Sequence, residues 1–117
     1  DALLGAVALG DIGTHFPSGN PEYAGISSVE LLSRTVALLH RNRWLPSNLD
    51  ATIVAQRPKL ASYLSAMRET VAQTLDIGLS QVSIKAKTTD GLGFTGRGEG
   101  IAAYVVALVS ESRDENL

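Results

Sequence analysis

The sequence has no cysteine among its 117 residues, and aromatic side chains make up only 5% of it. Without cysteine the chain can form neither a disulfide framework nor a thiolate metal site. One tryptophan, three tyrosines and two phenylalanines are too few for the stacking platforms that bind single-stranded nucleic acid. A formal net charge of −2 also lacks the basic excess of nucleic-acid-binding proteins. We therefore expect no nucleic-acid partner.

Long hydrophobic runs are missing too. The longest run near the start, residues 2–10, is too short to cross a bilayer and lacks the basic flank of a signal peptide. We therefore expect no membrane partner. A hydrophobic content of 44% and a charged content of 19% are ordinary for one globular domain of this length. We assign residues 1–110 to that domain and expect residues 111–117 to form a frayed acidic tail.

The most unusual stretch is residues 85–100, K-A-K-T-T-D-G-L-G-F-T-G-R-G-E-G, which holds five glycines, two adjacent threonines and three basic side chains. Such glycine density suits a backbone that needs a positive φ or that approaches a ligand closely. Backbone N–H groups and basic side chains together can bind phosphate. On composition alone, a glycine-rich hairpin without a ligand explains the stretch equally well.

Two common nucleotide-binding loops can be excluded from the flanks of this stretch. Residues 91–96 fit G-x-G-x-x-G, but that fingerprint needs a strand before it and a helix after it. Residues 82–86 are a plausible strand, whereas residues 101–109 are β-branched and apolar and favour a second strand over a helix. No G-K-[ST] occurs, so a P-loop is excluded as well.

The remaining chain alternates between helical and strand patterns. We predict a buried helix over 2–9, a turn at 10–13 and a long loop over 14–26. Ser27 and Glu30 fit a capping box that opens a helix running out at 41–43, with Pro46 blocking its continuation. A strand over 49–56, buried on both faces, precedes a helix whose apolar stripe faces the core and which Gly78 closes. That stripe consists of Leu60, Leu64, Met67, Val71 and Leu75.

Four separated segments resemble one known family. They are D-A-L-L-G-A continuing to L-G-D-I-G and F-P at residues 1–17, S-V-E-L-L at 28–32, A-Q-R-P-K at 55–59, and T-T-D-G-L-G-F-T-G-R-G-E-G-I-A at 88–102. In this order they resemble the 2-C-methyl-D-erythritol 2,4-cyclodiphosphate synthase family of the non-mevalonate isoprenoid pathway. The resemblance runs from residue 1 to about residue 109. With the order of elements, it implies an α+β single domain, a mixed β-sheet covered on one face by helices, that assembles as a homotrimer.

The resemblance also implies an activity. The expected enzyme is a phosphorus–oxygen lyase that converts 4-diphosphocytidyl-2-C-methyl-D-erythritol 2-phosphate to the 2,4-cyclodiphosphate and CMP. Zn²⁺ and either Mg²⁺ or Mn²⁺ are the implied cofactors, and an isoprenoid diphosphate can occupy the trimer's central cavity. The implied compartment is the bacterial cytoplasm or the plastid stroma. The alternative is a non-catalytic trimer of the same fold that binds CMP or a diphosphate.

Position by position, the resemblance implies three groups of substrate-binding residues. The first lies near the start and comprises Asp11, Ile12, Gly13, Phe16 and Asn20. The second forms the cytidine pocket and comprises Ala55, Gln56, Pro58, Lys59, Leu60 and Ala61. The third comprises Lys87, Thr88, Thr89, Asp90, Phe94 and Arg97. Within it, Thr88 is the catalytic residue, Asp90 binds the divalent ion on the diphosphate, and Phe94 and Arg97 line the central cavity.

The sequence departs from the family pattern at three places. Ser18-Gly19-Asn20 stands where acidic residues commonly follow Phe-Pro, and Asp90 stands where a glutamate is usual. The family's zinc ligands, an Asp-x-His and a second His, lie upstream of its first motif and are not in this chain. His15 and His40 are not at ligand positions, so we expect the zinc ligands in an N-terminal segment outside this sequence. For Arg97, an ion pair with Glu99 is the alternative to the interface role that we favour.

Overall fold

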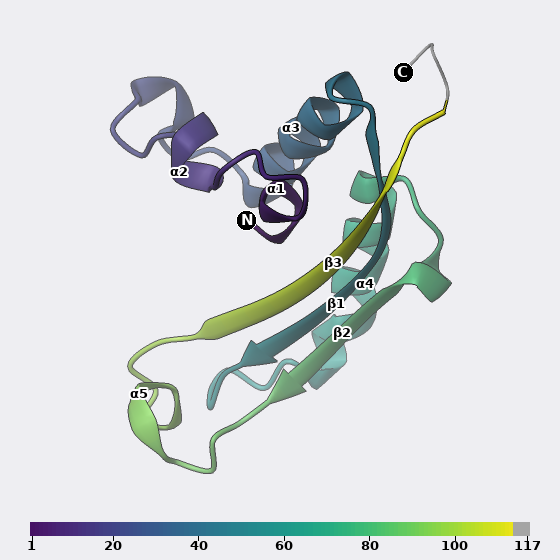
Figure 1. Ribbon diagram of the computed structural model, residues 1–117. Coiled ribbons are helices and arrows are strands. Elements are labelled where there is room, and N and C mark those ends of the chain that lie inside the picture. The colour runs from purple at the N-terminus through teal and green to yellow at the C-terminus, as the bar shows by residue number, and fades with distance from the viewer. Residues whose placement is uncertain (114–117) are drawn as a thin grey trace.

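The computed structural model describes residues 1–113, which form one three-stranded sheet with helices against it (Figure 1). Strands β1 (Trp44–Val54), β2 (Val82–Lys87) and β3 (Ala102–Glu111) lie in the order β2-β1-β3. β1 pairs with β2 in parallel and with β3 in antiparallel, so the predicted mixed sheet is confirmed. The helices are α1 (Ala2–Ala6), α2 (Ile12–His15), α3 (Ser28–Arg41), α4 (Leu64–Leu75) and α5 (Gly93–Gly96), with 3₁₀ turns η1 (Pro21–Tyr23), η2 (Ala61–Tyr63) and η3 (Leu79–Gln81).

The three longer helices pack on the same face of the sheet. Leu4 of α1, Leu39 of α3 and Leu75 of α4 are at most 1% exposed and form the centre of the core. Leu49 of β1 and Ala107 of β3, which are register partners, pack against this cluster. Because side chains on a strand alternate between faces, the neighbouring positions point away from the helices. The prediction of a sheet covered on one face is therefore confirmed.

The other face of the sheet is open and unevenly composed. On β3 it presents Tyr104, Val106 and Leu108, which are 66%, 75% and 58% exposed. Next to them on β1 and β2, Asp50 forms an ion pair with Lys85. We call Tyr104, Val106 and Leu108 the β3 apolar stripe.

Two helices end earlier than the sequence predicts. α1 stops at Ala6 because Ala8 adopts a left-handed φ of 57°, and Leu9 N–H then donates to the Leu4 carbonyl at 2.9 Å. α4 stops at Leu75 because Asp76, not Gly78, takes the left-handed conformation, with a φ of 56°. Both ends are Schellman-type reversals without the glycine that usually marks them. The predicted α4 stripe is half-buried from Leu60 to Val71, and only Leu75 is fully buried.

The start of α3 confirms half of the predicted capping box. Ser27 is the N-cap, and its hydroxyl accepts from Val29 N–H at 3.2 Å. Glu30, however, does not reach back to the N-cap, because its carboxylate binds Arg34 one turn later at 3.1 Å.

β1 begins at Trp44, five residues before the predicted start. Pro46 lies within the strand, at a register shift against β3 where the missing N–H is tolerated. The strand is mostly half-buried rather than buried on both faces, since only one face carries helices. The tail also begins later than residue 111: Glu111 belongs to β3, and Ser112 N–H donates to the Arg43 carbonyl at 2.8 Å. Residues 114–117 lie outside the described part of the chain.

The glycine-rich stretch is not a hairpin. β2 and β3 lie on opposite sides of β1, so residues 88–101 must cross the end of β1 to join them (Figure 1). The stretch contains one helical turn, α5, which the sequence analysis did not predict. We call residues 88–100 the glycine loop.

Candidate functional site

A cleft of about 330 Å³ opens where the parallel strands β1 and β2 both end. Ala55 N–H donates to the Lys87 carbonyl at 3.0 Å, which continues the strand pairing to the rim of the cleft. In open α/β sheets, ligands bind at such carboxyl ends of parallel strands. Its lining holds eight of the predicted site residues and Ala86, which the sequence analysis had placed only in a strand. They are Ala55, Gln56, Pro58, Lys59, Leu60, Ala61, Lys87 and Thr88.

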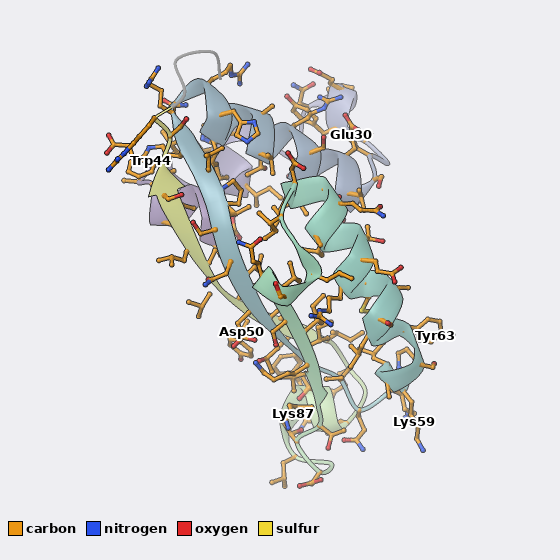
Figure 2. All side chains as sticks on the ribbon, turned by 90° about the vertical axis from the view of Figure 1, so that its right-hand side faces the viewer. Glu30, Trp44, Asp50, Lys59, Tyr63 and Lys87 are labelled. Atoms are coloured by element: carbon orange, nitrogen blue, oxygen red, sulfur yellow. The ribbon has the colours of Figure 1, made fainter. Side chains whose placement is uncertain are left out.

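Two lysines give this cleft a positive rim. Lys59 and Lys87 are exposed and lie at the same end of the molecule, opposite Trp44 (Figure 2). Neither forms a salt bridge with any residue among 1–113. Ammonium groups without carboxylate partners are available for phosphate. The rest of the lining is mostly apolar, which suits a flat ring system rather than a second charged group.

The glycine loop leaves the cleft through a tight, left-handed turn. Asp90 has a φ of 53° and Gly91 one of 82°. Left-handed backbone is uncommon for a residue with a side chain, although aspartate tolerates it better than most. Thr88 Oγ1 lies 3.3 Å from both the N–H and the carboxylate Oδ1 of Asp90, so the hydroxyl steadies the turn. The Asp90 carboxylate is exposed beside the cleft, where it can accept a cation.

Close backbone packing holds the rest of the loop together. A Cβ added to Gly96 would lie 2.3 Å from the carbonyl carbon of Gly91 and 2.8 Å from Thr89 Oγ1, so only glycine fits there. Thr95 is 5% exposed, and its hydroxyl lies 3.2 Å from that of Thr89. Thr89 therefore serves the fold of the loop, because its hydroxyl also binds the Leu92 carbonyl.

Asp11, Ile12 and Gly13 belong to a different part of the molecule. Asp11 is the N-cap of α2, and its Oδ1 accepts from Thr14 Oγ1 at 2.7 Å and from Thr14 N–H at 2.9 Å. These hydrogen bonds, led by that from the Thr14 hydroxyl, lower the pKa of the exposed Asp11 carboxyl below its usual value. Asp1 Oδ1 accepts from Ile12 N–H at 2.7 Å and fixes the same turn.

Phe16 and Asn20 lie on the segment that follows, which is more ordered than the predicted loop. The Phe16 and Tyr23 rings meet edge to face with centroids 5.4 Å apart, and the Arg34 guanidinium lies 5.9 Å from the Tyr23 ring centroid. Asn20 Oδ1 caps η1 by accepting from Glu22 N–H at 3.0 Å. That oxygen is therefore already engaged, and the amide nitrogen of Asn20 is the group left to contact a ligand.

One chain does not bring the predicted groups together. The α2 segment and the glycine loop with α5 lie toward opposite ends of the sheet (Figure 1). Phe94 is 53% exposed on α5, and Arg97 Nε binds Glu99 Oε1 at 2.5 Å. The ion pair that we considered the less favoured alternative for Arg97 is therefore formed. The cleft and the glycine loop make one candidate site, and the Asp11 turn lies apart from it.

Two further features were examined over residues 1–113. A larger cleft of about 710 Å³ runs along β3 beside Asp1 and Tyr104, but it has no lysine or arginine and sits away from the glycine loop. Within this range, no three histidine, aspartate or glutamate side chains gather closely enough to hold a metal ion. The residues therefore do not fit a zinc centre. No described helix is long and apolar enough to cross a membrane.

The mixed sheet and its carboxyl-end cleft can be compared with known proteins. The sequence profile of the YgbB family matches residues 1–110, and the chain belongs to this family. It is 52% identical to 2-C-methyl-D-erythritol 2,4-cyclodiphosphate synthase of Clostridium perfringens over 93% of this chain and 70% of that protein. The synthase of Azotobacter vinelandii is 54% identical over 93% of this chain and 69% of that protein.

Solved structures give the same answer. The bifunctional IspDF of Campylobacter jejuni superposes with a TM-score of 0.90 at 36% identity, over 95% of this chain and 30% of that one. The CDP complex of IspF from Plasmodium falciparum superposes with a TM-score of 0.82 at 28% identity, over 97% of this chain and 67% of that one. The family is therefore one of enzymes, and these relatives support the synthase function over the non-catalytic alternative.

Proposed function

We propose that this chain contributes the nucleotide and diphosphate site of a cyclising, CMP-releasing phosphorus–oxygen lyase. The substrate is 4-diphosphocytidyl-2-C-methyl-D-erythritol 2-phosphate. An oxygen of the 2-phosphate attacks the β-phosphorus, the bond from that phosphorus to the CMP oxygen breaks, and CMP leaves with the bonding electrons. The products are CMP and a cyclic diphosphate, so no further reactant is needed. The observation that carries this proposal is the apolar cleft with two unpaired lysines beside the Asp90 turn.

The cleft supports separate roles for its two kinds of lining. The cytosine ring occupies the apolar part between Ala55, Pro58 and Leu60, where backbone groups read its edge. Lys59 and Lys87 at the rim neutralise the phosphates. Such a reaction demands alignment of the attacking and leaving oxygens and neutralisation of charge rather than covalent catalysis. Fixing one end of the substrate in the cleft serves both demands.

Thr88 and Asp90 provide the groups closest to the phosphates. The Thr88 hydroxyl, 3.3 Å from Asp90 Oδ1, is placed to donate to the developing charge on the β-phosphate. Asp90 offers the hard oxygen ligand that Mg²⁺ or Mn²⁺ prefers, and phosphate oxygens complete such a site. A divalent ion held there withdraws charge from the diphosphate. Because residues 1–113 do not fit zinc, we derive no step from it and expect its ligands outside this sequence.

We also propose that the molecule works as a homotrimer with its sites between subunits. Two observations support this. The Asp11 turn and the cleft lie apart in one chain, so a second copy is needed to bring Asp11, Ile12, Gly13, Phe16 and Asn20 near a substrate. The β3 apolar stripe is also exposed in one chain, which is typical of a surface that another subunit covers. Exposed Phe94 and paired Arg97 would then line a central cavity for an isoprenoid diphosphate, and the compartment would be the cytoplasm or plastid stroma, as the resemblance implies.

Ligand binding tests the site directly. Titration calorimetry of the chain should detect CMP binding without metal and tighter binding of CDP when Mg²⁺ is added. Asp90→Asn keeps the side-chain shape but removes the charge, so it should abolish the Mg²⁺-dependent gain and leave CMP affinity unchanged. Glu99→Gln, in the same loop but paired with Arg97, is the control. No CMP binding by the unaltered chain would refute the proposed function.

The oligomeric state tests the trimer. Val106→Lys places a charge at the centre of the β3 apolar stripe and should convert the trimer to monomers, as measured by light scattering after size exclusion. Val29→Lys introduces the same change at a valine that is 46% exposed on α3 and should leave the mass unchanged. A monomeric unaltered chain would contradict the proposal.

A further inference from the structure

The side chain of Gln56 connects the two parts of the candidate site. Gln56 follows β1 directly, is half-buried and lines the cleft. Its Oε1 accepts a hydrogen bond of 3.2 Å from the backbone N–H of Gly91, which lies 35 residues later in the glycine loop. Because an N–H can only donate, this contact fixes the orientation of the amide, with the oxygen toward the loop.

The hydrogen bond reaches the loop at its most constrained point. Gly91 N–H belongs to the peptide that joins the two left-handed residues Asp90 and Gly91. Left-handed backbone at a residue with a side chain persists only when its surroundings hold it there. Three contacts do so here: Thr88 Oγ1 on one side of Asp90, Gly96 packed against Gly91, and Gln56 Oε1 from the sheet. Of the three, only Gln56 lies outside the loop.

We propose that Gln56 is a positioning residue that fixes the Asp90 turn relative to the cleft. It would act through Gly91 rather than by touching the substrate, although the sequence analysis grouped it with the substrate-binding residues. The inference rests on the proposed function for the role of Asp90 as the cation ligand. It deepens that function, because it makes the metal-dependent part of binding depend on a residue of the base pocket.

Three variants separate positioning from other roles. Gln56→Leu removes the acceptor at similar size, and Gln56→Glu restores it. The matched control is Gln81→Leu, because Gln81 Oε1 accepts from Gly78 N–H at 2.8 Å at the opposite end of β2. This control breaks the same kind of bond far from the cleft, so it reports the general cost of losing one glutamine contact.

The first measurement is backbone ¹⁵N relaxation of the unliganded chain. In Gln56→Leu the order parameters of Asp90 and Gly91 should fall from the rigid range of about 0.85 toward about 0.6. In Gln56→Glu and Gln81→Leu they should stay in the rigid range. Unchanged order at Asp90 and Gly91 in Gln56→Leu would overturn the inference, whatever the chain binds.

The second measurement is the affinity for CMP without metal and for CDP with Mg²⁺. In Gln56→Leu we expect the Mg²⁺-dependent gain for CDP to fall about two- to tenfold, the value of one hydrogen bond, with CMP affinity unchanged. An equal loss for CMP and CDP would overturn the inference, because Gln56 would then be a wall of the base pocket. Failure of the unaltered chain to bind CDP would instead refute the proposed function, and the order parameters would still decide whether Gln56 holds the turn.

Discussion

The two ends of the sheet are built by different means. At the end near Trp44, apolar side chains of α1, α3 and α4 fill the space above the strands, and three leucines are at most 1% exposed. At the end near Lys87, the described residues of the glycine loop bury one side chain, that of Thr95. Figure 2 shows the labelled residues Trp44 and Lys87 at these opposite ends.

The difference separates stability from function. Burial of apolar area stabilises the first end without requiring a particular backbone shape. The second end depends on hydrogen bonds and on glycine contacts that specify backbone position, as the packing of Gly96 on Gly91 shows. A site that holds phosphates needs exposed N–H groups and cations, which an apolar core cannot supply. Changes at the first end should therefore alter folding, and changes at the second should alter binding.

The largest effect should come from the core. Leu39→Ala removes a fully buried side chain and should lower the free energy of unfolding by about 2–5 kcal/mol. Leu92→Ala in the glycine loop, where the side chain is 73% exposed, should change it by less than about 0.5 kcal/mol. Urea unfolding of both variants measures the contrast. Equal losses would show that the loop contributes to the core after all.

A smaller effect on stability, with a larger effect on binding, should follow from Gly96→Ala. The added Cβ would lie 2.3 Å from Gly91 backbone, so the loop must open, at a cost of about 1–3 kcal/mol. The Mg²⁺-dependent affinity for CDP should fall more steeply than stability does, as calorimetry would show. Gly19→Ala meets no atom within 4 Å and should change neither. Retained CDP affinity in Gly96→Ala would contradict the role of this contact.

A gain in stability should follow from Gly5→Ala in α1. A Cβ there meets nothing within 4 Å, and alanine loses less conformational entropy than glycine in a helix. Thermal or urea unfolding should show a gain of about 0.5–1 kcal/mol with unchanged CMP affinity. A loss of stability would mean that the end of α1 requires glycine.

The smallest effect concerns the Asp11 turn. Its carboxyl has a pKa below the usual value in the folded chain, so its contribution to stability is complete above that usual value and is lost as the pH falls through the lowered pKa. Thr14→Val removes the hydroxyl that donates to Asp11 at 2.7 Å and should raise this pKa toward the usual value. NMR titration of the Asp11 carboxyl carbon measures the shift. An unchanged pKa would assign its cause to the backbone N–H of Thr14 alone.

Local patterns predicted most of the fold. The hydroxyl of Ser27 opened α3 as expected, and the β-branched run after residue 101 formed β3 and excluded a dinucleotide fold. The predictions that failed depended on contacts elsewhere. Ala8 and Asp76 reverse the chain without glycine, and Pro46 lies inside a strand where the register shifts against β3. Neither a reversal at alanine nor a tolerated proline has a signal in its own neighbours.

The site divides in the same way. The residue types around Lys59 and Asp90, matched to a family signature, were sufficient to predict a nucleotide and diphosphate site. Only the folded chain showed that eight of these residues line one cleft while the Asp11 turn lies apart. It also showed that Gln56 binds Gly91 and that Arg97 binds Glu99. The sequence by itself determined helices, strands and the chemistry of the glycine loop, because those depend on periodicity, capping and residue type. Tertiary structure decided which groups meet, because a contact across 35 residues depends on the strand order β2-β1-β3 and not on local pattern.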